Sequence, residues 1–227
     1  MSAHSVSNHL LSPVNYLYRS AKVFPDKVAV INGSERYTYA QFQERVFRLA
    51  NALTRRGIGK GDKVAFICPN IAPMLEAHYA VPMIGAALVS INIRLSPGEI
   101  EYIINHSDAK ALFVDNEFAH TVLPILDRLT DIELLVNICD ASDEKPLDGE
   151  AYEDLLAGST AEPVSLAIDD EYDIATINYT SGTTGGPKGV MYHHRGAYLN
   201  ALGEQVEFGT NYQSVYLWTL PMFHCNG

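Results

Sequence analysis

The sequence predicts an α/β fold in which a mainly parallel sheet is flanked by helices. Two observations carry this prediction: short apolar runs rich in β-branched residues recur along the chain, and segments with helical spacing of apolar residues separate them. Parallel strands need crossover connections of about a dozen residues, which these helical segments supply. With 227 residues, 47% of them hydrophobic, the chain is long enough to bury a substantial core.

The first strong signal is a helix that begins after Thr38. Thr38 and Gln41 form a capping box, in which each side chain bonds the backbone N–H of the other residue, and the cap stabilises the helix by about 1 kcal/mol. The apolar side chains that follow recur at helical spacing on one stripe: Phe42, Val46, Leu49, Ala50 and Leu53. Gly57 and Gly59 predict the end of this helix.

Four buried strands are expected where short apolar runs end at a turn or at the start of a helix. They occupy residues 63–68, 87–91, 111–114 and 134–138. Helical connections are predicted between them at 72–84, after Ser96 and at 118–129. Ser96 and Glu99 form a second capping box, with Pro97 at the first helical position. This alternation indicates βαβ units, so these strands are expected to run parallel.

The last part of the chain departs from this alternation. Residues 140–150 are acidic and contain proline and glycine, which predicts a surface connection. A strand is expected at 174–179, the last strand of a hairpin at 190–192, and a helix at 196–206.

The most informative stretch directly follows the strand expected at 174–179. Small hydroxyl residues, glycines and one lysine are gathered there, and such groups cradle phosphate. Glycines let backbone N–H groups approach an anion, hydroxyls donate hydrogen bonds, and the lysine adds a positive charge. The sequence therefore predicts polyphosphate contacts from Thr180, Ser181, Gly182, Thr183, Thr184, Gly185 and Lys188.

Two other interpretations of this stretch exist. The P-loop of nucleotide triphosphatases requires G-x-x-x-x-G-K-[ST]; counted from Gly182, the sixth position is Pro187 and the residue after Lys188 is Gly189, so the motif fails twice. The other interpretation is a solvated turn with an ordinary surface lysine. Eleven consecutive residues of this composition, beginning at Tyr179, favour phosphate binding over that turn.

These residues resemble the signature of the adenylate-forming, or AMP-binding, enzyme superfamily, which includes acyl-CoA synthetases, the adenylation domains of peptide synthetases, and luciferases. Residues 180–189 match its Thr/Ser/Gly-rich loop, which closes on Pro-Lys-Gly, position for position. Residues 49–53, 61–65 and 95–99 look like family segments in family order, and 220–224 is similar to a motif near the acyl pocket. Within the superfamily the chain resembles the N-terminal portion of an acyl-CoA synthetase, or fatty acid:CoA ligase.

The resemblance implies an activity: ATP-dependent conversion of a carboxylic acid, here a fatty acid, to an acyl adenylate and then to acyl-CoA. ATP, Mg²⁺ and CoA would take part. The loop would hold the ATP phosphates, and His224 would bind substrate, although a lone histidine in such a place is more often structural. Residues 1–170 would form a βαβ subdomain, and 171–227 the loop hairpin, a helix and the start of the acyl pocket.

The resemblance also implies that parts of the family's machinery are missing. Family members are more than twice as long, and their acidic Mg²⁺ ligand, ribose-binding aspartate and catalytic lysine follow the position of Gly227. We therefore expect an incomplete N-terminal adenylation domain with no catalytic residue of its own, inactive alone. Its last strand, the apolar run 215–220, would have no following partner, so the side chains around Leu217, Trp218, Leu220 and Phe223 are expected to be exposed and to favour self-association. A peptide-synthetase adenylation domain and a stand-alone nucleotide-binding or regulatory fragment stay open as alternatives.

Charge and hydropathy limit the partners. The formal net charge of −11 argues against nucleic acid and anionic membranes, which bind basic surfaces. No stretch approaches the roughly 20 apolar residues of a membrane span, and the first residues lack the pattern of a secretion signal. We therefore expect a cytoplasmic protein without an integral membrane segment, whose partners are small-molecule substrates.

Cysteine and histidine spacing indicates no metal site. Cys68, Cys139 and Cys225 are widely separated, which suggests neither disulfides nor a zinc site and fits a reducing cytoplasm. His193 and His194 are adjacent, so their side chains diverge at the start of a helix, and no third ligand is evident. Family members usually carry Thr or Ser as a helix cap where His193 stands, which leaves the capping of this helix open.

Overall fold

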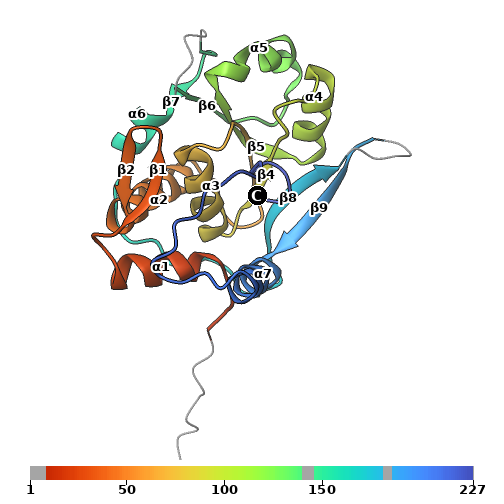
Figure 1. Ribbon diagram of the computed structural model, residues 1–227. Helices are drawn as coiled ribbons and strands as arrows, with labels where there is room; N and C mark the ends of the chain where they lie inside the picture. The colour runs from red at the N-terminus through yellow and green to blue at the C-terminus, as the bar shows by residue number, and fades with distance from the viewer. Residues whose placement is uncertain (1–8, 140–145, 181–185, 227) are drawn as a thin grey trace, which may run out of the picture.

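The computed structural model describes residues 9–139, 146–180 and 186–226. Within these residues a sheet of seven strands runs in the order β7-β6-β5-β3-β4-β8-β9 (Figure 1). All neighbouring pairs are parallel except β8 and β9, which form an antiparallel hairpin. The strand bounds are Lys63–Ile67 (β3), Ala87–Ser90 (β4), Ala109–Asp115 (β5), Leu134–Ile138 (β6), Glu150–Ala151 (β7), Ile174–Thr180 (β8) and Lys188–His193 (β9). The predicted α/β class, the four parallel strands and the final hairpin are therefore confirmed.

Helices cover both faces of the sheet (Figure 1). One apolar core lies between the sheet and a layer made of α1 (Val14–Val23), α2 (Tyr39–Arg55), α3 (Ala72–Met83) and α6 (Tyr152–Ala157). A second core lies on the opposite face, under α4 (Pro97–His106) and α5 (Ala119–Val122). Successive residues of β3 alternate between the two cores, because side chains along a strand point to opposite faces. Burial on both faces explains why these strands are continuous apolar runs.

Both predicted capping boxes form. Thr38 Oγ1 accepts a hydrogen bond from the Gln41 backbone N–H at 3.3 Å, and Gln41 Oε1 accepts one from the Thr38 N–H at 2.9 Å. At α4 the Ser96 backbone N–H donates to Glu99 Oε2 at 2.9 Å. Helices α2 and α4 therefore begin where the sequence predicts, and their apolar stripes pack on opposite faces of the sheet.

A buried ion pair ties the helices of one face together. Glu76 on α3 is fully buried, and its carboxylate accepts hydrogen bonds from Arg45 Nε at 2.5 Å and from the Tyr152 hydroxyl at 2.5 Å. Arg45 also pairs with Glu153 at 2.6 Å. Burial raises the pKa of Glu76, and the Arg45 guanidinium opposes that rise. Loss of one partner would leave a buried charge unpaired, so the group locks α2, α3 and α6 in register.

Several elements were not predicted from the sequence. These are α1, α6, β7 and an antiparallel pair formed by β1 (Val28–Asn32) and β2 (Glu35–Thr38). Gly33, at the turn of that pair, has a φ of 57°, a left-handed conformation that glycine adopts without strain. The strands β1, β2 and β7 and the helix α6 are short, so their periodicity gives little signal. Helix α1 did carry a signal that was missed, because its buried residues Val14, Leu17 and Ala21 recur at helical spacing.

Two predictions at the level of elements are wrong. Residues 118–129 do not form one α-helix: α5 is followed by the 3₁₀ helix η2 (Leu123–Arg128), because Pro124 has no N–H to donate and its ring clashes with the preceding turn. The apolar run at 215–220 is not a strand, and it lies along the surface without regular structure. The last helix, α7 (His194–Glu207), begins two residues before the predicted start at 196.

Candidate functional site

The β8–β9 hairpin holds the two ends of the predicted phosphate loop. Thr180 ends β8, Lys188 begins β9, and their Cα atoms pair across the hairpin. Both residues are exposed, and the ends of β8 and β9 that carry them extend beyond the body of the molecule (Figure 1). The five remaining predicted contacts, Ser181, Gly182, Thr183, Thr184 and Gly185, lie outside the described residues. Of the predicted phosphate ligands, the structure therefore brings Thr180 and Lys188 together.

Aromatic side chains of α4 pack beside both stems of this loop. The Tyr102 and His106 rings stack with their centroids 5.2 Å apart, and His106 Nδ1 shares a hydrogen bond of 2.8 Å with the Tyr179 hydroxyl. Burial raises the pKa of Tyr179 to about 12, so its hydroxyl is neutral. On the other stem, a Cβ placed on Gly186 would lie 3.0 Å from the Tyr102 ring. Helix α4 therefore limits where the loop ends can lie.

Asparagines fix the segment that carries His224. Asn70, just after β3, donates from Nδ2 to the Leu220 carbonyl at 2.7 Å and accepts from the Met222 N–H at 2.8 Å. Asn178 on β8 donates to the Phe223 carbonyl at 3.2 Å. Met222 and Phe223 are buried and His224 is exposed, so the predicted substrate residue faces solvent from an anchored turn.

Sequence reasoning missed Asn70 and Asn178. One signal was present: asparagine is disfavoured in strands, so Asn178 within the β-branched run of β8 marked a position with a specific role. Asn70 follows a parallel strand at the carboxyl edge of the sheet, where ligand sites of α/β folds lie.

The end of this turn, which we call the 222–226 turn, is strained. Cys225 and Asn226 have φ values of 52° and 66°, in the left-handed region that side chains with a Cβ rarely adopt. Asn226 Nδ2 lies 3.0 Å from Thr176 Oγ1, and the Tyr192 hydroxyl bonds Cys225. The turn therefore rests on β8 and β9.

The structure does not bring His224 and Lys188 together. The 222–226 turn meets β9 at Tyr192, and Lys188 lies four residues further along the strand, roughly 13 Å away at the rise of a β-strand. In Figure 1 the end of β8 and the start of β9 lie away from the label of the C-terminus. The predicted phosphate contacts thus lie at the loop end of the hairpin and the predicted substrate contact on the separate 222–226 turn, and their roles stay predictions.

The adjacent histidines have different surroundings. His193 Nδ1 accepts a hydrogen bond of 2.9 Å from the Gly196 N–H. His193 therefore caps α7 in place of the Thr or Ser that is usual in the family. His194 is fully buried, and its Nδ1 lies 2.9 Å from Ser12 Oγ. Burial lowers the pKa of His194 to about 4. The two rings therefore serve separate structural contacts.

The described residues do not build a metal site. Among residues 9–139, 146–180 and 186–226, no group of three or more His, Cys, Asp or Glu side chains could hold a metal ion. The Mg²⁺ that the family resemblance implies therefore finds no acidic cluster among the described residues.

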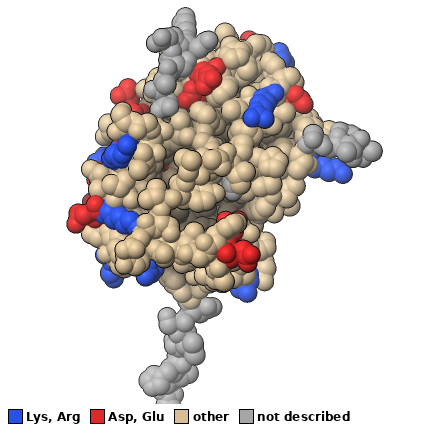
Figure 2. Space-filling view, viewed as in Figure 1, with Lys and Arg blue, Asp and Glu red and all other residues tan. Residues whose placement is uncertain are grey.

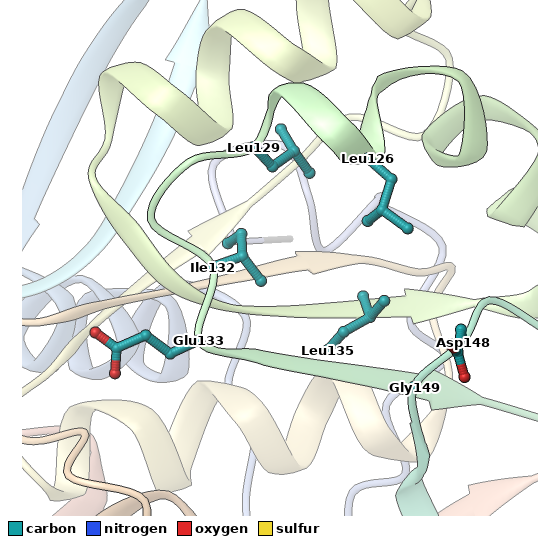
Figure 3. A pocket seen from close by; sticks show the side chains of 7 residues that line it. All are labelled: Leu126, Leu129, Ile132, Glu133, Leu135, Asp148 and Gly149. Atoms are coloured by element: carbon teal, nitrogen blue, oxygen red, sulfur yellow. The ribbon is translucent and has the colours of Figure 1, made fainter.

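Surface charge adds little to the site, but a cavity of about 530 Å³ lined by residues of α4, among them Tyr102 and His106, borders the ends of the loop. Figure 2 shows acidic and basic side chains scattered around the edge of one face, without a large patch of one sign, so an anion would depend on local donors. A cavity of about 380 Å³ opens between η2 and β6 and is lined mainly by Leu126, Leu129, Ile132 and Leu135 (Figure 3). This cavity is at the opposite end of the sheet from the β8–β9 hairpin, so it is not part of the candidate site.

The geometry at the hairpin agrees with the comparison that identifies the family. A model of the AMP-binding enzyme family matches residues 17–227. The chain belongs to this family. The AMP-binding chain is 45% identical to a 4-hydroxybutyrate–CoA ligase of Metallosphaera sedula, over 95% of this chain and 40% of that protein. It is 43% identical to an acetate–CoA ligase of Humulus lupulus, over 96% of this chain and 41% of that protein.

Solved structures of CoA ligases share the fold. A long-chain-fatty-acid–CoA ligase from Archaeoglobus fulgidus matches 97% of the AMP-binding chain and 44% of its own length, with a TM-score of 0.83 and 27% identity. An o-succinylbenzoate–CoA synthetase from Bacillus subtilis matches with a TM-score of 0.73 and 26% identity, over 92% of this chain and 50% of that one. The chain thus spans about 40% of the length of the curated relatives described above. In the described residues, no helix is long and apolar enough to cross a membrane.

Proposed function

We propose that this chain supplies the ATP-phosphate-binding part of an AMP-forming acid:CoA ligase. The observation that carries the proposal is the pairing of Thr180 with Lys188 at the ends of the Thr/Ser/Gly-rich loop. Membership of the AMP-binding family and the CoA ligases among its relatives support it. ATP, CoA and a carboxylic acid are the proposed substrates, with Mg²⁺ accompanying ATP.

The chemistry explains why such a loop is needed. A carboxylate attacks the α-phosphorus of ATP, a bond to the pyrophosphate oxygen breaks, and two anions must approach each other. Donors that gather the phosphates lower this barrier by positioning and by stabilising the charge that leaves with pyrophosphate. Lys188, Thr180, Ser181, Thr183 and Thr184 are the proposed donors, with Gly182 and Gly185 giving the backbone access to the phosphates. The CoA thiol then attacks the acyl adenylate and releases AMP.

We propose a short aliphatic acid as the substrate. The relatives at 45%, 43% and 42% identity are described as ligases of 4-hydroxybutyrate, of acetate, and of acetate or butyrate. The long-chain ligase among the solved structures is 27% identical. His224, on the exposed side of the 222–226 turn, is the proposed acid contact. The division into residues 1–170 and 171–227 is part of this proposal.

The test uses the product of the complete reading frame that encodes residues 1–227, here called the complete gene product. It is assayed for acid-dependent ATP–pyrophosphate exchange and for CoA thioester formation with acetate, butyrate, 4-hydroxybutyrate and palmitate. We expect exchange and thioester with the short acids, and no thioester from residues 1–227 alone. Exchange that depends on amino acids, without thioester, would support a peptide-synthetase adenylation domain. ATP binding without exchange would support a nucleotide-binding module.

The subcellular location of the protein is also a proposal. The scattered cysteines fit a cytoplasmic protein, but four relatives of Arabidopsis thaliana and one of Petunia hybrida are described as peroxisomal. Fractionation of cells that produce the complete gene product decides between these compartments.

A further inference from the structure

His78 on α3 is a buried histidine whose tautomer is determined by its neighbours. His78 Nδ1 lies 2.8 Å from the Met74 carbonyl oxygen, and a carbonyl can only accept. Nδ1 therefore carries the hydrogen. Burial lowers the pKa of His78, so the ring is neutral and Nε2 presents a lone pair. An acceptor buried in this way requires a donor.

The side chain that faces this acceptor is Asn226 of the 222–226 turn. Asn226 is within hydrogen-bonding reach of the His78 ring. As placed, its nitrogen is directed to Thr176 Oγ1 at 3.0 Å. His78 Nε2 and Asn226 Oδ1 both lack a hydrogen-bond partner among the described residues. Two buried acceptors are thus left without a donor, an arrangement that native interiors avoid.

Rotation of the Asn226 amide by half a turn gives each of these two acceptors a hydrogen-bond donor. The amide nitrogen and oxygen exchange places with no other heavy atom moving, since the two are nearly indistinguishable by shape. Nδ2 then donates to His78 Nε2, and Oδ1 accepts from the Thr176 hydroxyl. We infer that Met74, His78, Asn226 and Thr176 form one continuous hydrogen-bond chain, and that His78 thereby positions the turn that carries His224.

This chain of bonds explains how a strained turn is kept. The left-handed residues Cys225 and Asn226 cost conformational energy, and only surrounding contacts hold such a backbone in place. His78 belongs to a helix packed in the main core, so it links the turn to the most rigid part of the molecule. The inference rests on the proposed function in one respect: His224 must lie on the substrate side of the turn.

The hydrogen-bond chain can be tested without any activity. In ¹⁵N-labelled protein the His78 ring nitrogens are assigned by comparison with His78→Gln. We expect Nδ1 protonated, Nε2 unprotonated but hydrogen-bonded, and slow exchange of the Asn226 side-chain amide protons. A protonated Nε2, or Asn226 amide protons that exchange as fast as those of exposed asparagines, would overturn the inference.

Substitutions at Asn226 test the amide orientation. Aspartate can accept but cannot donate, so Asn226→Asp should be as harmful as Asn226→Ala if the amide donates to His78. If Oδ1 instead accepts from His78, aspartate should be tolerated, and the inference fails.

Kinetics of the complete gene product test the positioning role. His78→Leu and Asn226→Ala should each raise the KM for the acid by about tenfold, the double variant should be no worse than either single one, and the KM for ATP should stay within about twofold. The exposed His120→Leu serves as the matched control and should change neither constant. Equal effects on both KM values would assign His78 a general structural role and refute the positioning role. A wild type without exchange would refute the proposed function, while the NMR result would still decide the hydrogen-bond chain.

Discussion

Gly186 shows how closely the ends of the phosphate loop are packed against α4. A Cβ at this position would lie 3.0 Å from Cζ and from the hydroxyl oxygen of Tyr102, closer than carbon and side-chain atoms normally approach. Gly186→Ala should therefore displace the loop stem and slow pyrophosphate exchange by the complete gene product by about 3- to 10-fold. The double variant Gly186→Ala/Tyr102→Ala should recover most of that loss, since residues in contact couple.

Gly98→Ala is the matched control for this pair. Gly98 lies on α4, the helix that carries Tyr102, but a Cβ at Gly98 would meet nothing within 4 Å. The Gly98→Ala variant should catalyse pyrophosphate exchange at the rate of the wild type. If the double variant is as slow as Gly186→Ala, the contact with Tyr102 does not set the position of the loop.

Single residues differ in how far the sequence predicts them. Thr180 and Lys188 belong to a continuous motif, and the hairpin that pairs them is a local structure, so both could be placed. Asn70 and Asn178 hold the 222–226 turn through bonds to residues 152 and 45 positions away. Long-range bonds of this kind leave no local pattern in the sequence. That His78 Nε2 is a buried acceptor likewise follows from tertiary contacts and could not be predicted from the sequence.

At the scale of elements, the start of α7 contains a pH-sensitive contact. Burial lowers the pKa of His194 from 6.5 to about 4, and Asp173 and His193 are the charged groups that face it. Between these two pH values the unfolded chain binds a proton that the folded chain does not. The contribution of neutral, buried His194 to the free energy of unfolding is therefore fully present above pH 6.5 and is lost as the pH falls toward 4.

Thermal unfolding measures this contribution. Between pH 8 and pH 5 the protonation of His194 should lower the free energy of unfolding by about 2 kcal/mol. For a chain of this size that corresponds to a fall in Tm of about 4–8 °C. In His194→Gln, which does not titrate, the fall in Tm over this range should be smaller by that amount. Parallel pH dependence of the two proteins would show that His194 titrates normally in the folded state.

Elements with strong periodicity or caps could be predicted, and others could not. Helices α2 and α4 begin at capping boxes, and β3 to β6 are apolar runs that the sheet buries on both faces. Residues 118–129 have helical periodicity, yet Pro124 forces a 3₁₀ turn that periodicity does not reveal. The segment 215–220 has the composition of a strand but pairs with none of the described strands.

On the scale of the whole molecule, apolar side chains are exposed along α7 and the segment that follows it. They include Leu199, Leu202, Val206, Phe208, Tyr212, Val215, Tyr216, Leu217 and Leu220. The predicted exposure is confirmed for Leu217 and Leu220, but Trp218 is only partly exposed and Phe223 is buried under the anchored 222–226 turn. The exposed surface thus begins on α7 and ends before that turn.

Exposed apolar area on this scale favours association, since burial stabilises by about 25 cal/mol per Å². The 227-residue chain should bind a hydrophobic fluorescent dye and elute larger than a monomer in size-exclusion chromatography. Leu217→Ser/Leu220→Ser should reduce both signals, whereas substitution of the buried Met222 should not do so without loss of folding. A monodisperse monomer that leaves the dye silent would contradict this prediction.

The role of the loop in ATP activation is tested most directly by Lys188→Ala in acid-dependent ATP–pyrophosphate exchange by the complete gene product. The charge that Lys188 meets is greatest in the transition state, so kcat should fall about 100-fold while the KM for the acid changes less than about threefold. Lys22→Ala, which removes an exposed lysine from the last turn of α1, should exchange like the wild type. Equal exchange rates for Lys188→Ala and the wild type would contradict phosphate binding by this loop.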